Sequence, residues 1–160
     1  MAIKVGDHIP NATFMTMTAD GPKQKTTDDI FKDKKVVLFA VPGAFTPTCH
    51  RNHLPGFVKS AAAIKAKGVD TIAVTGVNDV FVMDAWKKAS GANAIEFLAD
   101  GSGAFAKTIG LSLDMTERGL GVRSQRYAMV VDDGVVKALN VEDGPGKAEI
   151  SGADNLLKAL

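Results

Sequence analysis

Two nearly continuous apolar runs place the strongest constraint on how this 160-residue chain folds. KKVVLFAV (34–41) and GVDTIAVTGV (68–77) are rich in β-branched residues, as is typical of strands buried on both faces of a sheet. Between them, FVKSAAAIKAK (57–67) has a helical pattern, and Gly68 is placed to end that helix. This order predicts a βαβ unit in which the two strands are parallel.

Beyond the second strand the pattern alternates between helical and extended segments. VFVMDAWKKAS (80–90) is predicted to be a helix that Asn78 or Asp79 caps and Gly91 closes. AIEFLA (94–99) is short and apolar, which predicts a further strand. These segments therefore predict a further helix and a further strand of the same sheet.

The last third of the chain predicts an antiparallel ending. Asp100 is placed to cap a short helix at 102–109. Asp133-Gly134 separates two apolar runs and tolerates the positive φ values of a type I′ turn, which predicts a hairpin. SGAD (151–154) resembles a capping box in front of a terminal helix at 155–160.

Taken together, these elements predict an α/β fold with a mixed central β-sheet and helices on both faces, in a single domain that spans residues 1–160. Net charge is +1, from 19 basic and 18 acidic residues without long runs, which argues against nucleic-acid binding by bulk electrostatics. We expect no signal peptide and no membrane segment, because no apolar run is long enough. One free thiol fits a reducing compartment, most simply the cytosol.

The single cysteine, Cys49, follows the first buried strand in the segment VPGAFTPTCH (41–50). Thr46 suits the N-cap of a helix and Pro47 suits its first position, so Cys49 falls in the first turn. Unpaired N–H groups and the positive end of the helix dipole favour a thiolate there. Because a more stable thiolate is a weaker nucleophile, the site must also stabilise charge in the transition state. We predict that Cys49 is a nucleophile.

Other interpretations of this cysteine remain open at the level of sequence. A lone cysteine is most often a small buried hydrophobe. His53, four residues after Cys49, could serve as the base of a thiol hydrolase. The non-catalytic alternative is that His50 and His53 only pack or form hydrogen bonds with their neighbours. A non-catalytic redox-binding or chaperone-like domain is the third possibility. One cysteine and two nearby histidines do not complete a tetrahedral set, so we predict no metal, and we expect a helix kink at PG (55–56).

The segment VPGAFTPTC, followed by HLPGF, resembles the type 5 subgroup of the peroxiredoxins. Pro42, Thr46 and Cys49 match the Pro-x-x-x-Thr-x-x-Cys pattern of that family. The resemblance extends to VNDVFVMDAW and QRYAMVVDDGVVKALNVE, and so covers most of the chain. It implies a thioredoxin-like fold and a peroxidase that reduces hydrogen peroxide and organic hydroperoxides without a cofactor.

The resemblance also implies a role for individual residues. Cys49 would be the peroxidatic cysteine, which attacks a peroxide oxygen and becomes a sulfenic acid. Thr46 would bind the peroxide and Pro42 would shield the thiolate from water. The active-site arginine of the family matches Arg126 in QRYAMVV, whereas the sequence context of Arg123 matches less well. A guanidinium and a hydroxyl suit the negative charge that develops as the O–O bond breaks.

The chain departs from those type 5 members that carry a second, resolving cysteine. Its C-terminal segment EDGPGKAEISGADNLLKAL contains none. We therefore predict a one-cysteine mechanism in which an external thiol, from glutathione, glutaredoxin or thioredoxin, recycles the sulfenic acid. The subgroup commonly forms homodimers with the interface near the active-site loops, so the resemblance also implies a homodimer.

Overall fold

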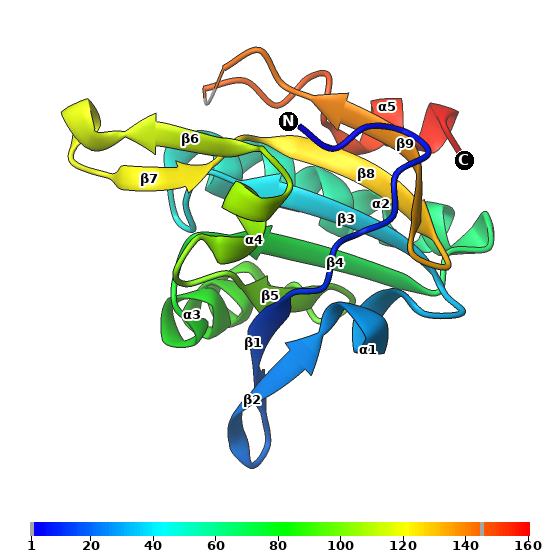
Figure 1. Ribbon diagram of the computed structural model, residues 1–160, viewed down its shortest axis with the longest axis horizontal. Coiled ribbons are helices and arrows are strands. Elements are labelled where there is room, and N and C mark those ends of the chain that lie inside the picture. Colours follow the sequence, from blue (N-terminus) through cyan, green and yellow to red (C-terminus); the bar gives the residue numbers. More distant parts are fainter. Residues whose placement is uncertain (1, 145) are drawn as a thin grey trace.

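The computed structural model describes residues 2–144 and 146–160, which form a mixed seven-stranded sheet, a separate two-stranded sheet and helices (Figure 1). The strands are β1 (Thr13–Thr18), β2 (Gly21–Thr26), β3 (Lys35–Val41), β4 (Thr71–Gly76), β5 (Glu96–Ala99), β6 (Ser112–Met115), β7 (Gly121–Ser124), β8 (Tyr127–Asp132) and β9 (Val135–Val141). The helices are α1 (Thr27–Phe31), the π-helical turn η1 (Cys49–His53), α2 (Leu54–Ala66), α3 (Val80–Ser90), α4 (Ala104–Thr108), the 3₁₀ turn η2 (Thr116–Arg118) and α5 (Ala153–Lys158). Within the described residues, no helix has both the length and the apolar character that a membrane crossing requires.

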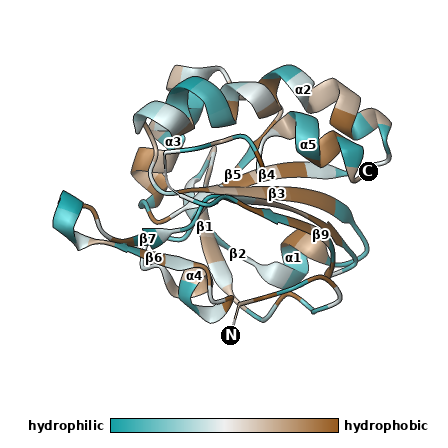
Figure 2. Ribbon diagram, turned by 90° about the horizontal axis from the view of Figure 1, so that it is seen from above, coloured by the Kyte–Doolittle hydropathy of each residue, from teal (hydrophilic) through white to brown (hydrophobic). Residues whose placement is uncertain are grey.

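The predicted βαβ unit is confirmed and forms the centre of the large sheet. β3 pairs in parallel with β4 on one side and antiparallel with β8 on the other, within the order β2-β1-β5-β4-β3-β8-β9. Alternate side chains of β3 point into two separate cores. Val37 and Phe39 pack in the core that includes α2 and α3, whereas Val36 and Leu38 pack in the core that includes α1 and α4. Figure 2 shows α2, α3 and α5 on one face of the sheet and α1 and α4 on the other. Burial on both faces explains why β3 is apolar throughout.

Local chemistry explains most of the other elements that the sequence predicted. Asp79 caps α3, because its carboxylate accepts the N–H groups of Phe81 and Val82. Gly91 ends the same helix in the left-handed conformation. The hairpin of β8 and β9 turns at Asp133 and Gly134, whose φ values of 46° and 80° are both positive. Each of these predictions is confirmed.

The C-terminal capping box was predicted wrongly. Gly152 occupies the N-cap position of α5, and no side chain caps that helix. The hydroxyl of Ser151 instead donates to the carboxylate of Glu142 at 2.7 Å. A buried carboxylate that needs donors competes successfully for this hydroxyl, because burial of an unpaired charge is costly. The pattern predicted a local contact, whereas the hydroxyl takes part in a tertiary one.

The helix that carries Cys49 is irregular at its start, and the irregularity lies before the predicted kink at residues 55–56. The first helical residue is Pro47, and the segment Cys49–His53 is a π-helical turn, closed by the Leu54 N–H donating to the Cys49 carbonyl. Pro55 lacks an N–H and its ring would clash with the carbonyl four residues earlier in a regular helix. The wider π turn accommodates the proline near the beginning of α2, as such turns frequently do at functional sites.

Candidate active site

The loop between β3 and the first helical turn is held from several directions. The Asn78 side chain accepts the Ala44 N–H at 2.9 Å, and Arg123 Nη1 donates to the Pro42 carbonyl at 3.4 Å. A Cβ at Gly43 would lie 3.0 Å from both the Arg123 guanidinium and the Thr46 side chain, so only glycine fits without displacement. The loop is therefore fixed by residues from the β4–α3 connection and from β7.

Thr46 lies at the N-cap position, as predicted, but its hydroxyl does not cap the helix. The Thr46 carbonyl accepts the His50 N–H at 2.8 Å, which begins the helical pattern. The Thr46 hydroxyl donates to the Gly43 carbonyl at 2.6 Å, and no described residue donates a backbone N–H to it. The hydroxyl proton is therefore used to shape the loop, which leaves the oxygen lone pairs as acceptors.

Arg126 and Cys49 are brought together by the register of the sheet. Tyr127 pairs with Ala40, which places Arg126 at the edge where β3 ends and the cysteine loop begins. Arg126 Nη2 donates to Cys49 Sγ at 2.9 Å, across 77 positions of sequence. Both side chains are buried, Arg126 at 2% exposure and Cys49 at 0%. A fixed positive charge thus lies against the sulfur of the only cysteine in the chain.

His53 is a buried partner of the same arginine. Its Nδ1 lies 3.0 Å from Arg126 Nη1, and its Nε2 lies 3.0 Å from the Ser151 carbonyl oxygen. Burial, reinforced by the charge of Arg126, lowers the pKa of His53 from 6.5 to about 3. The imidazole is therefore neutral at physiological pH.

This burial predicts a pH-dependent stability that depends on His53. Below about pH 6.5 the unfolded chain protonates His53 and the folded chain does not, so the free energy of unfolding falls as the pH falls. Between pH 6.5 and 5 this one group should cost about 2 kcal/mol. The charge of Arg126 opposes protonation of His53 and the charge of Glu142 favours it, and the pKa of about 3 already includes both effects. Chemical unfolding at each pH should show a flatter dependence in His53→Asn than in wild type or in His8→Gln, and equal slopes would contradict the assignment.

Glu142 closes this set of contacts from its far side. Its carboxylate accepts the Ser151 N–H at 2.9 Å, the Ser151 hydroxyl, and the Ile150 N–H at 3.2 Å. Burial alone would oppose ionisation, but these donors together hold the pKa of Glu142 below its usual value. The Glu142 N–H in turn donates to the Arg126 carbonyl at 2.9 Å. Ser151 and Glu142 are site residues that sequence reasoning missed.

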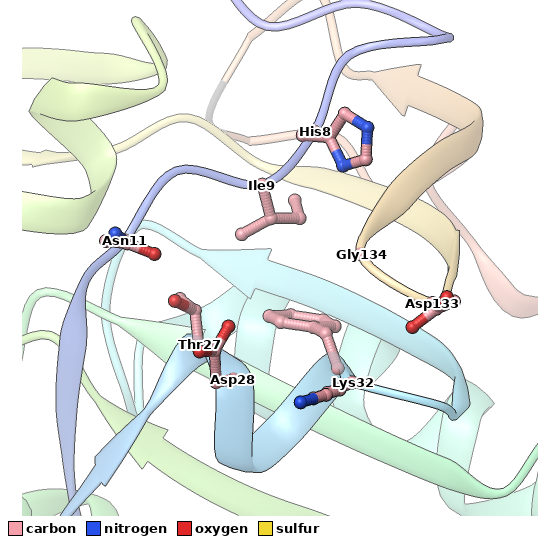
Figure 3. Close-up of a pocket in the computed structure, with 9 residues that line it drawn as sticks. His8, Ile9, Asn11, Thr27, Asp28, Lys32, Asp133 and Gly134 are labelled. Carbon is pink, nitrogen blue, oxygen red and sulfur yellow. The ribbon is translucent and has the colours of Figure 1, made fainter.

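A pocket of about 280 Å³ opens beside the buried sulfur. Pro42, Thr46 and Arg126, three of the predicted site residues, line it together with Pro47, Thr48, Met115, Arg118, Leu120 and Gly146. A larger pocket of about 380 Å³, drawn in Figure 3, lies near His8, Asp28 and Asp133. It sits at the opposite ends of β3 and β8 from Cys49, whereas the smaller pocket is lined by Arg126, which contacts the sulfur, so the smaller pocket is the better candidate.

His50 has a packing role, as the non-catalytic interpretation of this residue predicted. Its Nδ1 accepts the indole N–H of Trp86 at 3.1 Å, and its ring lies 5.7 Å from that of Phe45. Phe45 has a φ of 65°, which is strained for a bulky residue, and it is 47% exposed. His50 thus links the cysteine loop to α3.

The hydrolase alternative does not survive this geometry. Both ring nitrogens of His53 are engaged, by Arg126 and by the Ser151 carbonyl, and the described residues include no hydrogen bond between Cys49 and His53. With a pKa of about 3, the imidazole is also a poor base near neutral pH. The sulfur has a cationic partner rather than a proton acceptor.

A thioredoxin-like sheet whose central strand β3 leads through a short loop to a buried cysteine, held against an arginine in a helical turn, is typical of a thiol oxidoreductase. The chain belongs to the redoxin family, whose model matches residues 4–157, and within it to the peroxiredoxins, the thiol peroxidases. Peroxiredoxin-2C of Oryza sativa is 48% identical over 99% of this chain and 98% of its own length.

Two solved structures support the same assignment. Reduced Prx3 from Vibrio vulnificus, in complex with hydrogen peroxide, is 51% identical over 98% of each chain, with a TM-score of 0.94. Peroxiredoxin 5 from Alvinella pompejana is 34% identical over 98% of this chain and 97% of its own, with a TM-score of 0.86. The predicted thioredoxin-like fold and the resemblance to type 5 peroxiredoxins are thus confirmed. The enzyme reduces peroxides through a cysteine.

Proposed function

We propose that Cys49 is the peroxidatic cysteine and that Arg126, Thr46 and Pro42 complete the site around it. The observation that carries this assignment is the 2.9 Å contact between Arg126 Nη2 and Cys49 Sγ. The thiolate attacks one peroxide oxygen and the O–O bond breaks. The departing oxygen takes up a proton as water or alcohol, and the sulfur becomes a sulfenic acid.

Arg126 supplies the stabilisation that the departing oxygen needs. Its guanidinium lines the pocket and touches the sulfur, so it lies beside both the attacking atom and the substrate. The peroxide bound in the Vibrio vulnificus structure supports a substrate site in a homologous fold. Pro42 lines the same pocket and limits the approach of water to the sulfur. A buried guanidinium is more effective there than in water.

Thr46 acts on the substrate as an acceptor. Because its proton is donated to the Gly43 carbonyl, its oxygen is oriented to accept the O–H of a peroxide. This fixes which peroxide oxygen faces the sulfur. The same hydroxyl therefore shapes the loop and orients the substrate.

We expect Thr46→Val to lower the second-order rate constant for peroxide roughly 10- to 100-fold, because the isosteric valine removes both hydrogen bonds. Thr46→Ser retains the hydroxyl and should stay within about threefold of wild type. Stopped-flow oxidation of the reduced enzyme measures both constants. Equal rates in the valine and serine variants would remove Thr46 from the mechanism.

An external thiol returns Cys49 to its reduced form in our proposal. With glutathione, the sulfenic acid forms a mixed disulfide and releases water, and a second thiol then frees the cysteine. Glutathione, glutaredoxin and thioredoxin are the reductant classes we propose, and the single cysteine supports the need for one of them. Mass spectrometry after one equivalent of peroxide, with and without glutathione, tests this. We expect a sulfenate or its glutathione adduct on Cys49, and unmodified Cys49 would contradict the proposal.

We also propose a homodimer in the cytosol. Exposed apolar side chains beside the cysteine loop, with Phe45 at 47% exposure and Phe81 at 64%, support an interface there. A thiol that must be reduced to act supports a reducing compartment. Light scattering of wild type and Phe81→Glu tests the dimer, which the substitution should dissociate.

A further inference from the structure

The buried polar contacts around Arg126 form a closed ring. Arg126 Nη1 contacts His53 Nδ1, His53 Nε2 contacts the Ser151 carbonyl, and Ser151 donates twice to the Glu142 carboxylate. The Glu142 N–H then returns to the Arg126 carbonyl. The ring joins η1 to the residue before β8 and to both ends of the segment that connects β9 with α5. These parts of the chain include residues as far apart in sequence as His53 and Ser151.

The partners in this ring fix the tautomer of His53. A guanidinium has no acceptor, so Arg126 donates and His53 Nδ1 accepts. A carbonyl oxygen has no donor, so the proton of the imidazole lies on Nε2 and points at Ser151. One neutral tautomer satisfies both contacts at once, and the side chain is 1% exposed, which leaves water little access to compete.

We propose that His53 is a positioning residue for the Arg126 guanidinium, and that Glu142 positions His53 in turn through Ser151. This inference rests on the proposed roles of Cys49 and Arg126 in peroxide reduction. Arg126 Nη2 contacts the sulfur while Nη1 is held by the imidazole, so the plane of the guanidinium is fixed by two points. The orientation of the guanidinium therefore depends on His53, which is not among the residues that line the pocket.

Amide replacements separate positioning from packing. In His53→Asn, the side-chain oxygen of the new asparagine takes the place of the acceptor at Nδ1, whereas in His53→Gln the side-chain nitrogen of the new glutamine takes the place of the donor at Nε2. We expect His53→Asn to lower the peroxide rate constant only about threefold to tenfold, because the acceptor for Arg126 is kept while the contact with Ser151 is lost. We expect His53→Gln to lower it roughly 10- to 100-fold, because the contact with Arg126 is lost.

Stopped-flow measurement can use the emission of Trp86, the single tryptophan, which is hydrogen-bonded to His50 beside the cysteine loop. Circular dichroism and thermal unfolding show whether each variant is folded. If the asparagine and glutamine variants lose activity equally, or if neither does, the positioning role is wrong. If wild type is no more active than Cys49→Ser, the proposed function itself has failed, which is a distinct result.

Two further measurements do not depend on the His53 variants. The ¹⁵N resonances of the imidazole should identify Nδ1 as the bare nitrogen and Nε2 as the protonated one, unchanged between pH 8 and 5, and the opposite tautomer would overturn the proposal. Glu142→Gln should lower the peroxide rate constant about threefold to tenfold, whereas the matched Glu149→Gln at an exposed position should not. Equal rates in these two variants would exclude Glu142 from the positioning role.

Discussion

Cys49→Ser should abolish peroxide consumption, with a loss on the order of 10³-fold or more in the second-order rate constant. The serine hydroxyl is nearly isosteric with the thiol but remains protonated near neutral pH, so no nucleophile remains beside Arg126. The surrounding contacts should survive, because Arg126 retains an oxygen to which it can donate. Consumption of peroxide under saturating glutathione measures the effect.

The serine variant also separates enzymatic turnover from chemistry in solution. Glutathione reacts slowly with peroxide unaided, and the residual rate in Cys49→Ser should equal that of glutathione alone. Thermal unfolding should remain close to that of wild type, since one buried atom is exchanged for another of similar size. A variant that is folded and still consumes peroxide at the original rate would end the peroxidase assignment for this cysteine.

Arg126→Lys should lower the peroxide rate constant by about 10² to 10³-fold while the charge is conserved. The guanidinium reaches Cys49 and His53 with two separate nitrogens, which the single ammonium of lysine cannot reproduce. The loss should appear in the oxidation step, because the charge develops when the O–O bond breaks. Single-turnover oxidation isolates that step from recycling by the thiol.

Arg51→Lys is the matched control for this substitution. Arg51 lies in the same π turn as Cys49 but is exposed, so the identical chemical change there should leave the rate constant within about twofold of wild type. Comparable losses in both variants would mean that helix stability, rather than the two contacts of the Arg126 guanidinium, limits the reaction.

The parts of the fold that could be predicted from sequence are those with local causes. The βαβ unit follows from continuous apolar runs, and the Asp133-Gly134 hairpin follows from turn chemistry within a few residues. The N-terminal hairpin of β1 and β2 was not predicted. Its second strand, GPKQKT, is mostly exposed and polar, so it carries little of the alternation that marks a strand.

The candidate site divides in a similar way. Pro42, Thr46 and Cys49 lie within eight positions, and their loop and helix start could be predicted from local rules. The match of Arg126 came from family resemblance, since only the pairing of β8 with β3 brings it to the sulfur. The ring through Ser151 could not be predicted, because its contact with His53 is made by a main-chain carbonyl that leaves no trace in the side-chain pattern.

The π-helical turn at Cys49–His53 ties the position of the sulfur to a proline outside the site. Pro55 is not among the residues that line the pocket beside Arg126, yet its missing N–H and its ring oppose regular α-helical winding across this turn. A regular α-helical turn in its place would rotate Cys49 relative to α2 and so change its position against Arg126. Pro55 therefore maintains the irregular helix start that holds the sulfur against Arg126.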